Sequence, residues 1–201
     1  MKKQGVFICI EGLDASGKTT QSKLLVKNLQ KRGFDAVYTT EPSRGQIGRL
    51  IRKHVLYEEK RLSAILEALL FAADRIDHIE REVKPKLNEG KIVVSDRYLY
   101  SSLAYQGAAD LDLKWIEGIN KWAKKPDLAI YIDISPEIVL QRLKRKKSVM
   151  ENLKNQQQVR EIYLKLVKTG VLKVIDGNKP KKDVAKEALD IVTSFLSAQG
   201  T

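Results

Sequence analysis

The chain has 201 residues, of which 43% are hydrophobic, and it carries a formal net charge of +12. This size and composition suit one compact globular domain and exclude a largely disordered chain. No apolar stretch approaches the roughly 20 residues of a membrane span, and the apolar run near the N-terminus is shorter than the roughly 7–15 residues of a signal-peptide core, so we expect a cytoplasmic protein without a membrane partner.

The predicted elements alternate between apolar strands and helices along the chain. We expect strands at residues 6–10, 36–40, 92–95, 128–132 and 172–175. Helices are expected at residues 18–31, 62–87, about 115–123, from Pro136 into the basic run 144–147, and about 182–196. Such alternation is typical of parallel β-α-β units in a sheet that helices cover on both faces. We therefore predict an α/β fold with a five-stranded parallel sheet, in one domain spanning residues 1–201.

The only cysteine, Cys9, lies inside the first apolar strand. A single cysteine cannot form an internal disulfide, which agrees with a reducing compartment. We interpret Cys9 as a small buried hydrophobic side chain and not as a nucleophile.

The first strand leads into the turn Gly12-Leu13-Asp14-Ala15-Ser16-Gly17-Lys18-Thr19. This turn matches the G-x-x-x-x-G-K-[ST] pattern of a P-loop, and it joins a strand to a helix as the motif requires. The backbone N–H groups of such a loop point at phosphate oxygens, and the following helix adds its positive end. Lys18 is expected to reach the β- and γ-phosphates, and the Thr19 hydroxyl to bind Mg²⁺.

The motif predicts a three-layer P-loop NTPase fold with ATP and Mg²⁺ as cofactors. The expected ATP-binding residues are Gly12, Ala15, Ser16, Gly17, Lys18, Thr19 and Thr20. The motif does not specify the reaction, because GTPases, motors, recombinases and small-molecule kinases all share it.

The third predicted strand ends in Ser95-Asp96-Arg97-Tyr98. Ligands of open parallel sheets bind beyond the carboxyl ends of the strands. Asp96 is suited to hold Mg²⁺ or its water, and Arg97 to bind a phosphate through two parallel N–H bonds. A surface ion pair between the two side chains is the alternative.

Three segments together resemble the thymidylate kinase family. They are the P-loop GLDASGKTT, the sequence LLFAADR at residues 69–75, and the sequence DRYLYSSLAYQG at residues 96–107. The resemblance covers nearly the whole chain. It implies that the γ-phosphoryl group of ATP is transferred to dTMP, giving dTDP and ADP.

The resemblance also implies roles for acceptor-site residues. Asp14 would hydrogen-bond to the 3′-hydroxyl of the deoxyribose, and Arg97 and Arg44 would hold the phosphate. Phe71 would stack on thymine, and Arg75, one helical turn later, would donate to its O4 atom. Core packing of Phe71 and an ion pair of Arg75 with Asp74 or Asp77 are the alternatives.

The segment after Arg97 would close around the nucleoside. Ser102 and Gln106 would line the base, and Tyr105 would fill the space beside C2′ and disfavour a ribonucleotide. Where many relatives carry two glycines after a proline, this chain has Ser43-Arg44, which leaves the geometry of that phosphate loop open.

A basic lid is expected at residues 142–155, because some family members place an arginine in the P-loop where this chain has Ala15. The missing cation would then come from the basic run that begins at Arg142, with Arg145 as the catalytic candidate beside Lys18, Asp14 and Arg97. Arg142 itself would pack on the adenine. The loop at residues 176–180 resembles the segment that lines the adenine pocket in this family. A solvated basic helix end is the alternative.

Two other functions remain open at this stage. One is a kinase of another pyrimidine monophosphate such as dUMP, and the other is a nucleic-acid-binding P-loop ATPase, which the charge of +12 favours. Basic residues alternate with acidic ones in most predicted helices, and no nucleic-acid-reading module is recognisable, so we expect no nucleic-acid partner.

A homodimer is expected from the resemblance and from the predicted helix at residues 62–87. This helix carries more apolar positions than one sheet face requires. Ile65, Leu69, Ile76 and Val83 therefore indicate a second buried surface.

Overall fold

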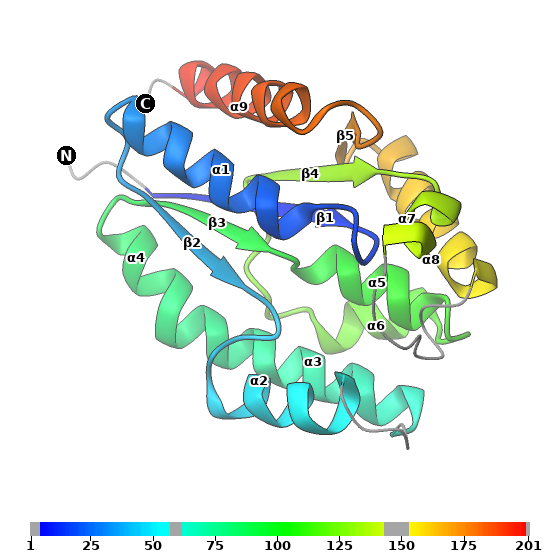
Figure 1. Cartoon of the computed structure of the whole chain (residues 1–201). Coiled ribbons are helices and arrows are strands. Elements are labelled where there is room, and N and C mark those ends of the chain that lie inside the picture. The colour runs from blue at the N-terminus through cyan, green and yellow to red at the C-terminus, as the bar shows by residue number, and fades with distance from the viewer. Residues whose placement is uncertain (1–4, 57–61, 143–152, 200–201) are drawn as a thin grey trace.

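The computed structural model describes residues 5–56, 62–142 and 153–199. Its centre is a parallel sheet with the strand order β2-β3-β1-β4-β5 (Figure 1). The strands are β1 (Val6–Gly12), β2 (Ala36–Thr40), β3 (Ile92–Asp96), β4 (Leu128–Asp133) and β5 (Lys173–Asp176). The predicted five-stranded parallel α/β fold is confirmed, with every strand within about two residues of its expected position.

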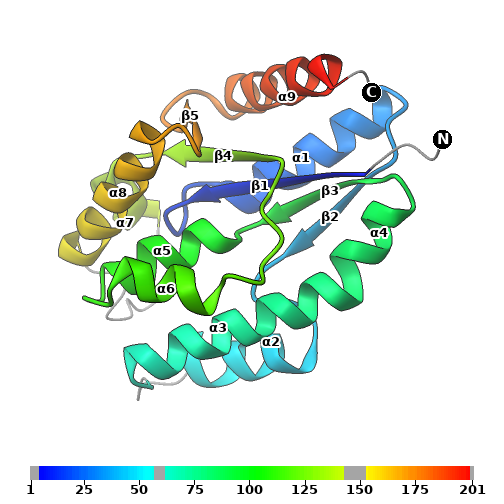
Figure 2. The ribbon, with the colours of Figure 1, turned by 180° about the vertical axis from the view of Figure 1, so that it is seen from behind.

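Helices cover both faces of the sheet. They are α1 (Lys18–Lys31), α2 (Gln46–Ile51), η1 (Arg52–Leu56), α3 (Ala64–His78), η2 (Ile79–Val83), α4 (Lys84–Asn88), α5 (Leu99–Gly107), α6 (Leu113–Ile119), α7 (Pro136–Arg142), α8 (Leu153–Lys168) and α9 (Lys181–Ala198). Helices α1 and α9 lie on one face, and the run from α3 to α4 lies with α5 and α6 on the other (Figures 1 and 2). None of the helices in the described ranges is long and apolar enough to cross a bilayer.

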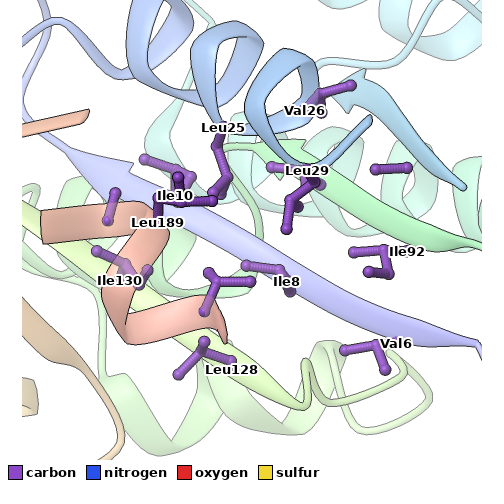
Figure 3. Close-up of a cluster of buried hydrophobic side chains, with 14 of the residues drawn as sticks. Val6, Ile8, Ile10, Leu25, Val26, Leu29, Ile92, Leu128, Ile130 and Leu189 are labelled. Atoms are coloured by element: carbon purple, nitrogen blue, oxygen red, sulfur yellow. The ribbon is translucent and has the colours of Figure 1, made fainter. Parts of the chain in front are cut away.

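Strand β1 supplies both halves of the core because its side chains alternate between the two faces. Val6, Ile8 and Ile10 face α1 and α9, where they pack in a cluster with Leu25 and Leu29 (Figure 3). Phe7 and Cys9 lie in the opposite cluster, which includes residues of η2, α4, α5 and α8. Cys9 is fully buried, as its interpretation as a small hydrophobic side chain predicts.

Local signals explain several helix ends. Helix α1 starts after Gly17, whose φ of 97° is left-handed, and the chain leaves it through Gly33 at φ 84°. The Ser63 side chain caps α3 by accepting a hydrogen bond from the Leu66 N–H at 3.3 Å. Pro136 is the first residue of α7, where a missing N–H costs nothing.

The predicted helix at residues 62–87 is a run of three segments, in which the π-helical η2 separates α3 from α4. Helix α6 ends at Ile119, four residues earlier than expected. Helices α2, α5 and α8 and the π-helical η1 were not predicted as helices from the pattern. The parallel strands direct the ends of β1, β3 and β4 to one edge of the sheet, where α5, α7 and α8 gather (Figure 1).

Candidate functional site

The P-loop connects Gly12, at the end of β1, to Lys18, the first residue of α1. A Cβ at Gly12 would lie 2.8 Å from the Ser16 Oγ and 2.9 Å from the Ile132 carbonyl oxygen, so only glycine fits. Ala15 also has a left-handed backbone, with φ 58°. The loop is therefore curled tightly, as phosphate binding by its N–H groups requires.

Lys18 turns back onto its own loop. Its Nζ donates to the Leu13 carbonyl oxygen at 2.5 Å, and its side chain is buried. Burial, together with the nearby Arg97 guanidinium, lowers the pKa of Lys18 to about 8. The amine is thus still largely protonated at neutral pH and available to an anion.

The first turn of α1 meets the end of β3 through Thr19 and Asp96. The Thr19 hydroxyl donates to Asp96 Oδ2, and the Tyr38 hydroxyl lies 3.3 Å from the same atom. Asp96 Oδ1 is buried and has no hydrogen-bond partner in the described parts of the chain. A hydroxyl, a carboxylate and an open acceptor fit Mg²⁺, which usually binds one or two carboxylates and completes its shell with waters and substrate phosphates.

Asp14, Arg97 and Tyr105 lie together on the other side of the P-loop. Arg97 Nη2 forms an ion pair with Asp14 and lies 3.4 Å from the Tyr105 hydroxyl. That hydroxyl accepts a hydrogen bond from the Asp14 N–H at 3.0 Å. The guanidinium also stands over the Tyr105 ring, 5.0 Å from its centroid. The structure therefore brings together three residues that the sequence predicts for the acceptor site.

Arg75 is one of the largest fully buried side chains. Its Nε and Nη2 donate to Glu41 Oε2 at 3.0 and 2.7 Å. Nη1 donates to Asn120 Oδ1 at 2.5 Å, and Nη2 also donates to the Ser102 Oγ at 3.1 Å. The alternative that paired Arg75 with Asp74 or Asp77 is wrong, because the buried charge is matched by Glu41 from the end of β2.

Asp74 has a different function, which settles the conformation of the loop after Pro42. Its carboxylate accepts hydrogen bonds from both the N–H and the hydroxyl of Ser43, each at 2.6 Å. The Ser43 Oγ in turn accepts from the Gly45 N–H at 3.0 Å. Arg44, next in the chain, is exposed and lines a cavity of about 220 Å³ with Asp77, His78 and Arg81 among its other walls.

The remaining acceptor-site candidates differ in burial. Phe71 is half-buried and belongs to neither hydrophobic cluster, which argues against the core-packing alternative. Gln106 is buried on α5, and its Oε1 has no hydrogen-bond partner in the described ranges. On the ATP side, Ser16 Oγ is likewise buried without a partner there, whereas Thr20 is exposed. Orphaned buried polar atoms mark places where a ligand can supply the missing partner.

The described residues include only part of the predicted lid. Arg142 is exposed at the end of α7, whereas Arg145 and the rest of the basic run lie outside the described residues. Arg160 on α8 donates from Nε and Nη2 to the two carboxylate oxygens of Asp133, both at 2.8 Å. In the loop after β5, a Cβ at Gly177 would lie 2.7 Å from Ile132 Cγ2, so this loop packs against the end of β4.

Five buried polar residues at this site were not predicted in their observed roles, namely Glu11, Glu41, Asp74, His78 and Asn120. Of these, only Asp74 was considered, as an alternative partner of Arg75. A carboxylate next to the P-loop at the end of an apolar strand was an available signal for Glu11. The other four are recognisable only through partners distant in sequence, since Arg75 lies 34 residues from Glu41 and 45 from Asn120.

Comparisons with known proteins agree with this geometry. The family model described as thymidylate kinase matches residues 10–188. A probable thymidylate kinase of Pyrococcus abyssi is 45% identical over 201 residues, which cover 96% of this chain and 98% of that protein. Another of Pyrococcus horikoshii is 40% identical with the same coverage, and one of Thermococcus gammatolerans is 39% identical over 94% of this chain and 96% of its own. The P-loop, the cluster of Asp14, Arg97 and Tyr105, and these matches along nearly the full length together show that the chain belongs to the thymidylate kinase family.

Proposed function

We propose that the protein transfers the γ-phosphoryl group of ATP to the 5′-phosphate of dTMP, giving ADP and dTDP. The observation that carries this proposal is the position of the Asp14–Arg97–Tyr105 cluster, directly against the P-loop that ends at Lys18. Family membership supports the same assignment. The domain is proposed to span the whole chain, residues 1–201, and to act in the cytoplasm, where an unpaired Cys9 stays reduced.

On the donor side, the P-loop N–H groups and Lys18 would bind the ATP phosphates. Phosphates would replace the Leu13 carbonyl as the partner of the Lys18 amine, which already lies inside the loop. Thr19 and Asp96 would hold Mg²⁺, which would neutralise charge on the phosphate oxygens when bound. Two buried polar atoms without a partner among the described residues support this arrangement: the Ser16 hydroxyl could donate to a phosphate oxygen, and Asp96 Oδ1 could accept from a water of Mg²⁺.

On the acceptor side, Arg97 and Arg44 would bind the dTMP phosphate, and Asp14 and Tyr105 would contact the sugar. Arg75 would recognise the base by a hydrogen bond. Its four hydrogen bonds leave one N–H of Nη1 without an acceptor among the described residues, which is a suitable donor for a thymine oxygen. Phe71, Ser102 and Gln106 would complete the base pocket. The γ-phosphoryl group would pass directly, in line, from ATP to the dTMP phosphate, with no covalent enzyme intermediate. The protein would position these two anions and neutralise their charge.

The cation that completes the transition state is proposed to come from the lid. Ala15 cannot supply it, and Arg160 already forms a bidentate pair with Asp133. Arg145 therefore remains the catalytic candidate, with Arg142 as the residue that would pack on the adenine.

The direct test is a substrate panel. The protein would be mixed with ATP, Mg²⁺ and one of dTMP, dUMP, the ribonucleotide of thymine or thymidine, and ADP release would be followed. We expect the highest kcat/KM with dTMP and no transfer to thymidine. Absence of ADP release with every monophosphate, together with gel-shift binding to nucleic acid that falls steeply with salt, would instead support the nucleic-acid-binding ATPase.

A homodimer is proposed from one exposed apolar surface. Ile65, Leu66 and Leu69 on α3 are 54%, 44% and 43% exposed, and Leu50 on the neighbouring α2 is 45% exposed. Val83, expected in the same surface, is fully buried in the core and is excluded from it, because η2 turns it toward the sheet. Light scattering at micromolar concentration should give twice the chain mass, and Leu69→Glu should give the single-chain mass. A wild-type monomer would contradict the dimer.

A further inference from the structure

A fully buried carboxylate, Glu11, lies between the P-loop and α5 and is assigned no contact with ATP or dTMP above. It immediately precedes Gly12 at the end of β1, and its side chain has no exposed surface. A buried carboxylate is costly unless hydrogen bonds or charges compensate it. Its partners therefore indicate what it does.

Glu11 accepts four hydrogen bonds. Oε1 accepts from the backbone N–H groups of Tyr98 at 3.0 Å and Ser101 at 3.2 Å. Oε2 accepts from the Ser101 hydroxyl at 2.6 Å and the Tyr163 hydroxyl at 3.1 Å. The first two bonds satisfy N–H groups at the start of α5, where Tyr98 provides no side-chain cap of its own. Glu11, near the end of β1, thus caps the N-terminus of α5.

The Ser101 hydroxyl extends this arrangement to the acceptor site. It donates to Glu11 Oε2 and accepts from Arg97 Nη1 at 3.1 Å. A continuous chain of hydrogen bonds therefore runs from the Arg97 guanidinium through the Ser101 hydroxyl to the buried Glu11 carboxyl group. Hydrogen bonds that involve ionised groups are stronger than neutral ones, and bonds in a chain polarise one another.

The backbone of Arg97 also requires such support. Its φ of 71° is left-handed, which is unfavourable for a residue with a side chain. Conformations of this kind persist only where surrounding contacts fix them. The Arg97 N–H donates to the Ile10 carbonyl oxygen, and Glu11, the next residue, holds Tyr98 and Ser101 on the other side. Two adjacent residues of β1 thus fix the backbone of Arg97 itself and of the residues that follow it.

We propose that Glu11 is a positioning residue that acts through the Ser101 hydroxyl to hold the Arg97 guanidinium in place for the phosphate of the acceptor nucleotide. This inference rests on the proposed function, because it assumes that Arg97 binds that phosphate. A carboxylate that only stabilised α5 would affect all ligands alike. A carboxylate that positions Arg97 affects the part of the affinity that the phosphate contributes.

The experiment measures the affinities of dTMP and thymidine by calorimetry, without ATP, for the wild type, three single variants and one double variant. It is done at about pH 8, where Glu11 is ionised although burial raises its pKa to about 7. Glu11→Gln removes the charge but keeps the shape, and Ser101→Ala removes the connecting hydroxyl but keeps Glu11 and the Ser101 N–H. Both should lower the ratio of dTMP affinity to thymidine affinity by about tenfold, the size of one charge-assisted hydrogen bond. The thymidine affinity should stay within about twofold, since its contacts are unchanged.

Tyr131→Phe is the matched control, because it removes a buried tyrosine hydroxyl that donates to Asp133 at 3.0 Å and not to Glu11 or Ser101. It should keep the wild-type affinity ratio. A double variant of Glu11→Gln and Ser101→Ala should lower the ratio no further than either change alone, since both break the same chain. If Glu11→Gln does not fold, Ser101→Ala carries the test by itself.

Three outcomes would overturn the positioning role. These are an unchanged ratio in Ser101→Ala, an equal loss of affinity for dTMP and thymidine in the variants, and a Tyr131→Phe protein that loses the ratio as strongly. A wild-type protein that binds dTMP no more tightly than thymidine would contradict the proposed function instead. The two failures are therefore distinguishable.

Discussion

Replacing Glu41 with glutamine tests the buried ion pair that holds Arg75 behind the acceptor site. The two side chains are 3% and 2% exposed, and Glu41 Oε2 accepts two hydrogen bonds from Arg75, while Oε1 lies 3.2 Å from the His78 Nδ1. Removing one partner of a buried pair costs roughly 3–5 kcal/mol. Because glutamine keeps one acceptor oxygen, we expect the lower end, a loss of about 3 kcal/mol in the free energy of unfolding.

Urea unfolding followed by circular dichroism measures this loss, which corresponds to a fall in Tm of about 6–12 °C for a domain of this size. Glu80→Gln is the matched control, because Glu80 pairs with Lys84 on the surface, where both side chains are more than half exposed. Its cost should stay below about 0.5 kcal/mol. If Glu41→Gln costs no more than Glu80→Gln, the buried charge on Glu41 is not what stabilises Arg75, and the reasoning fails.

Three further predictions concern single residues. Lys18→Ala should lower kcat/KM by at least about 10²–10³-fold while the circular dichroism spectrum is unchanged, because the amine is directed at phosphate; an active variant would contradict the P-loop assignment. Tyr105→Ala should raise the kcat/KM of the ribonucleotide relative to dTMP by about tenfold, whereas Tyr105→Phe, which keeps the ring, should leave the ratio unchanged. Burial raises the pKa of Glu11 from 4.5 to about 7, only partly offset by Ser101, Arg97, Tyr163 and Lys18, so the folded state binds more protons than the unfolded state between these values. The stability that this carboxyl contributes is complete below the unfolded pKa and is lost as the pH rises through about 7, so the wild-type free energy of unfolding relative to Glu11→Gln should fall by up to about 3 kcal/mol from acid to neutral pH. A pH-independent difference would show that folding does not change the pKa of Glu11.

The sequence predicted those features that depend on neighbours along the chain. Each strand is a short apolar run, and the P-loop is a contiguous motif whose glycines are required by the geometry at Gly12 and Gly17. Helix α2 and the π-helical η1 were missed because Arg49, Arg52, Lys53 and His54 interrupt their apolar pattern. Helix α2 is stabilised by packing on α3, and η1 contacts α2.

The acceptor site was predictable only in outline. Resemblance indicated Arg75, Asp14 and Tyr105, but pattern alone could not identify Glu41 as the carboxylate that compensates Arg75. A buried charge is matched by whichever partner the fold brings near, and that partner lies on another element. For the same reason the sequence left the Ser43-Arg44 loop open, whereas its conformation is fixed by Asp74, 31 residues away.

The accessibility of the Cys9 thiol reports separation of the central strands of the sheet. This thiol is the only one in the chain and sits in β1, with β3 and β4 hydrogen-bonded on either side. Burial also raises its pKa, so the folded protein holds no reactive thiolate. A thiol-specific dye can therefore label it only after the central strands separate, and the labelling rate measures that rare event without interference from fraying at the surface. Because ATP or dTMP would bind only the closed form, each should slow the labelling in proportion to its affinity, which would yield a binding assay that requires no turnover.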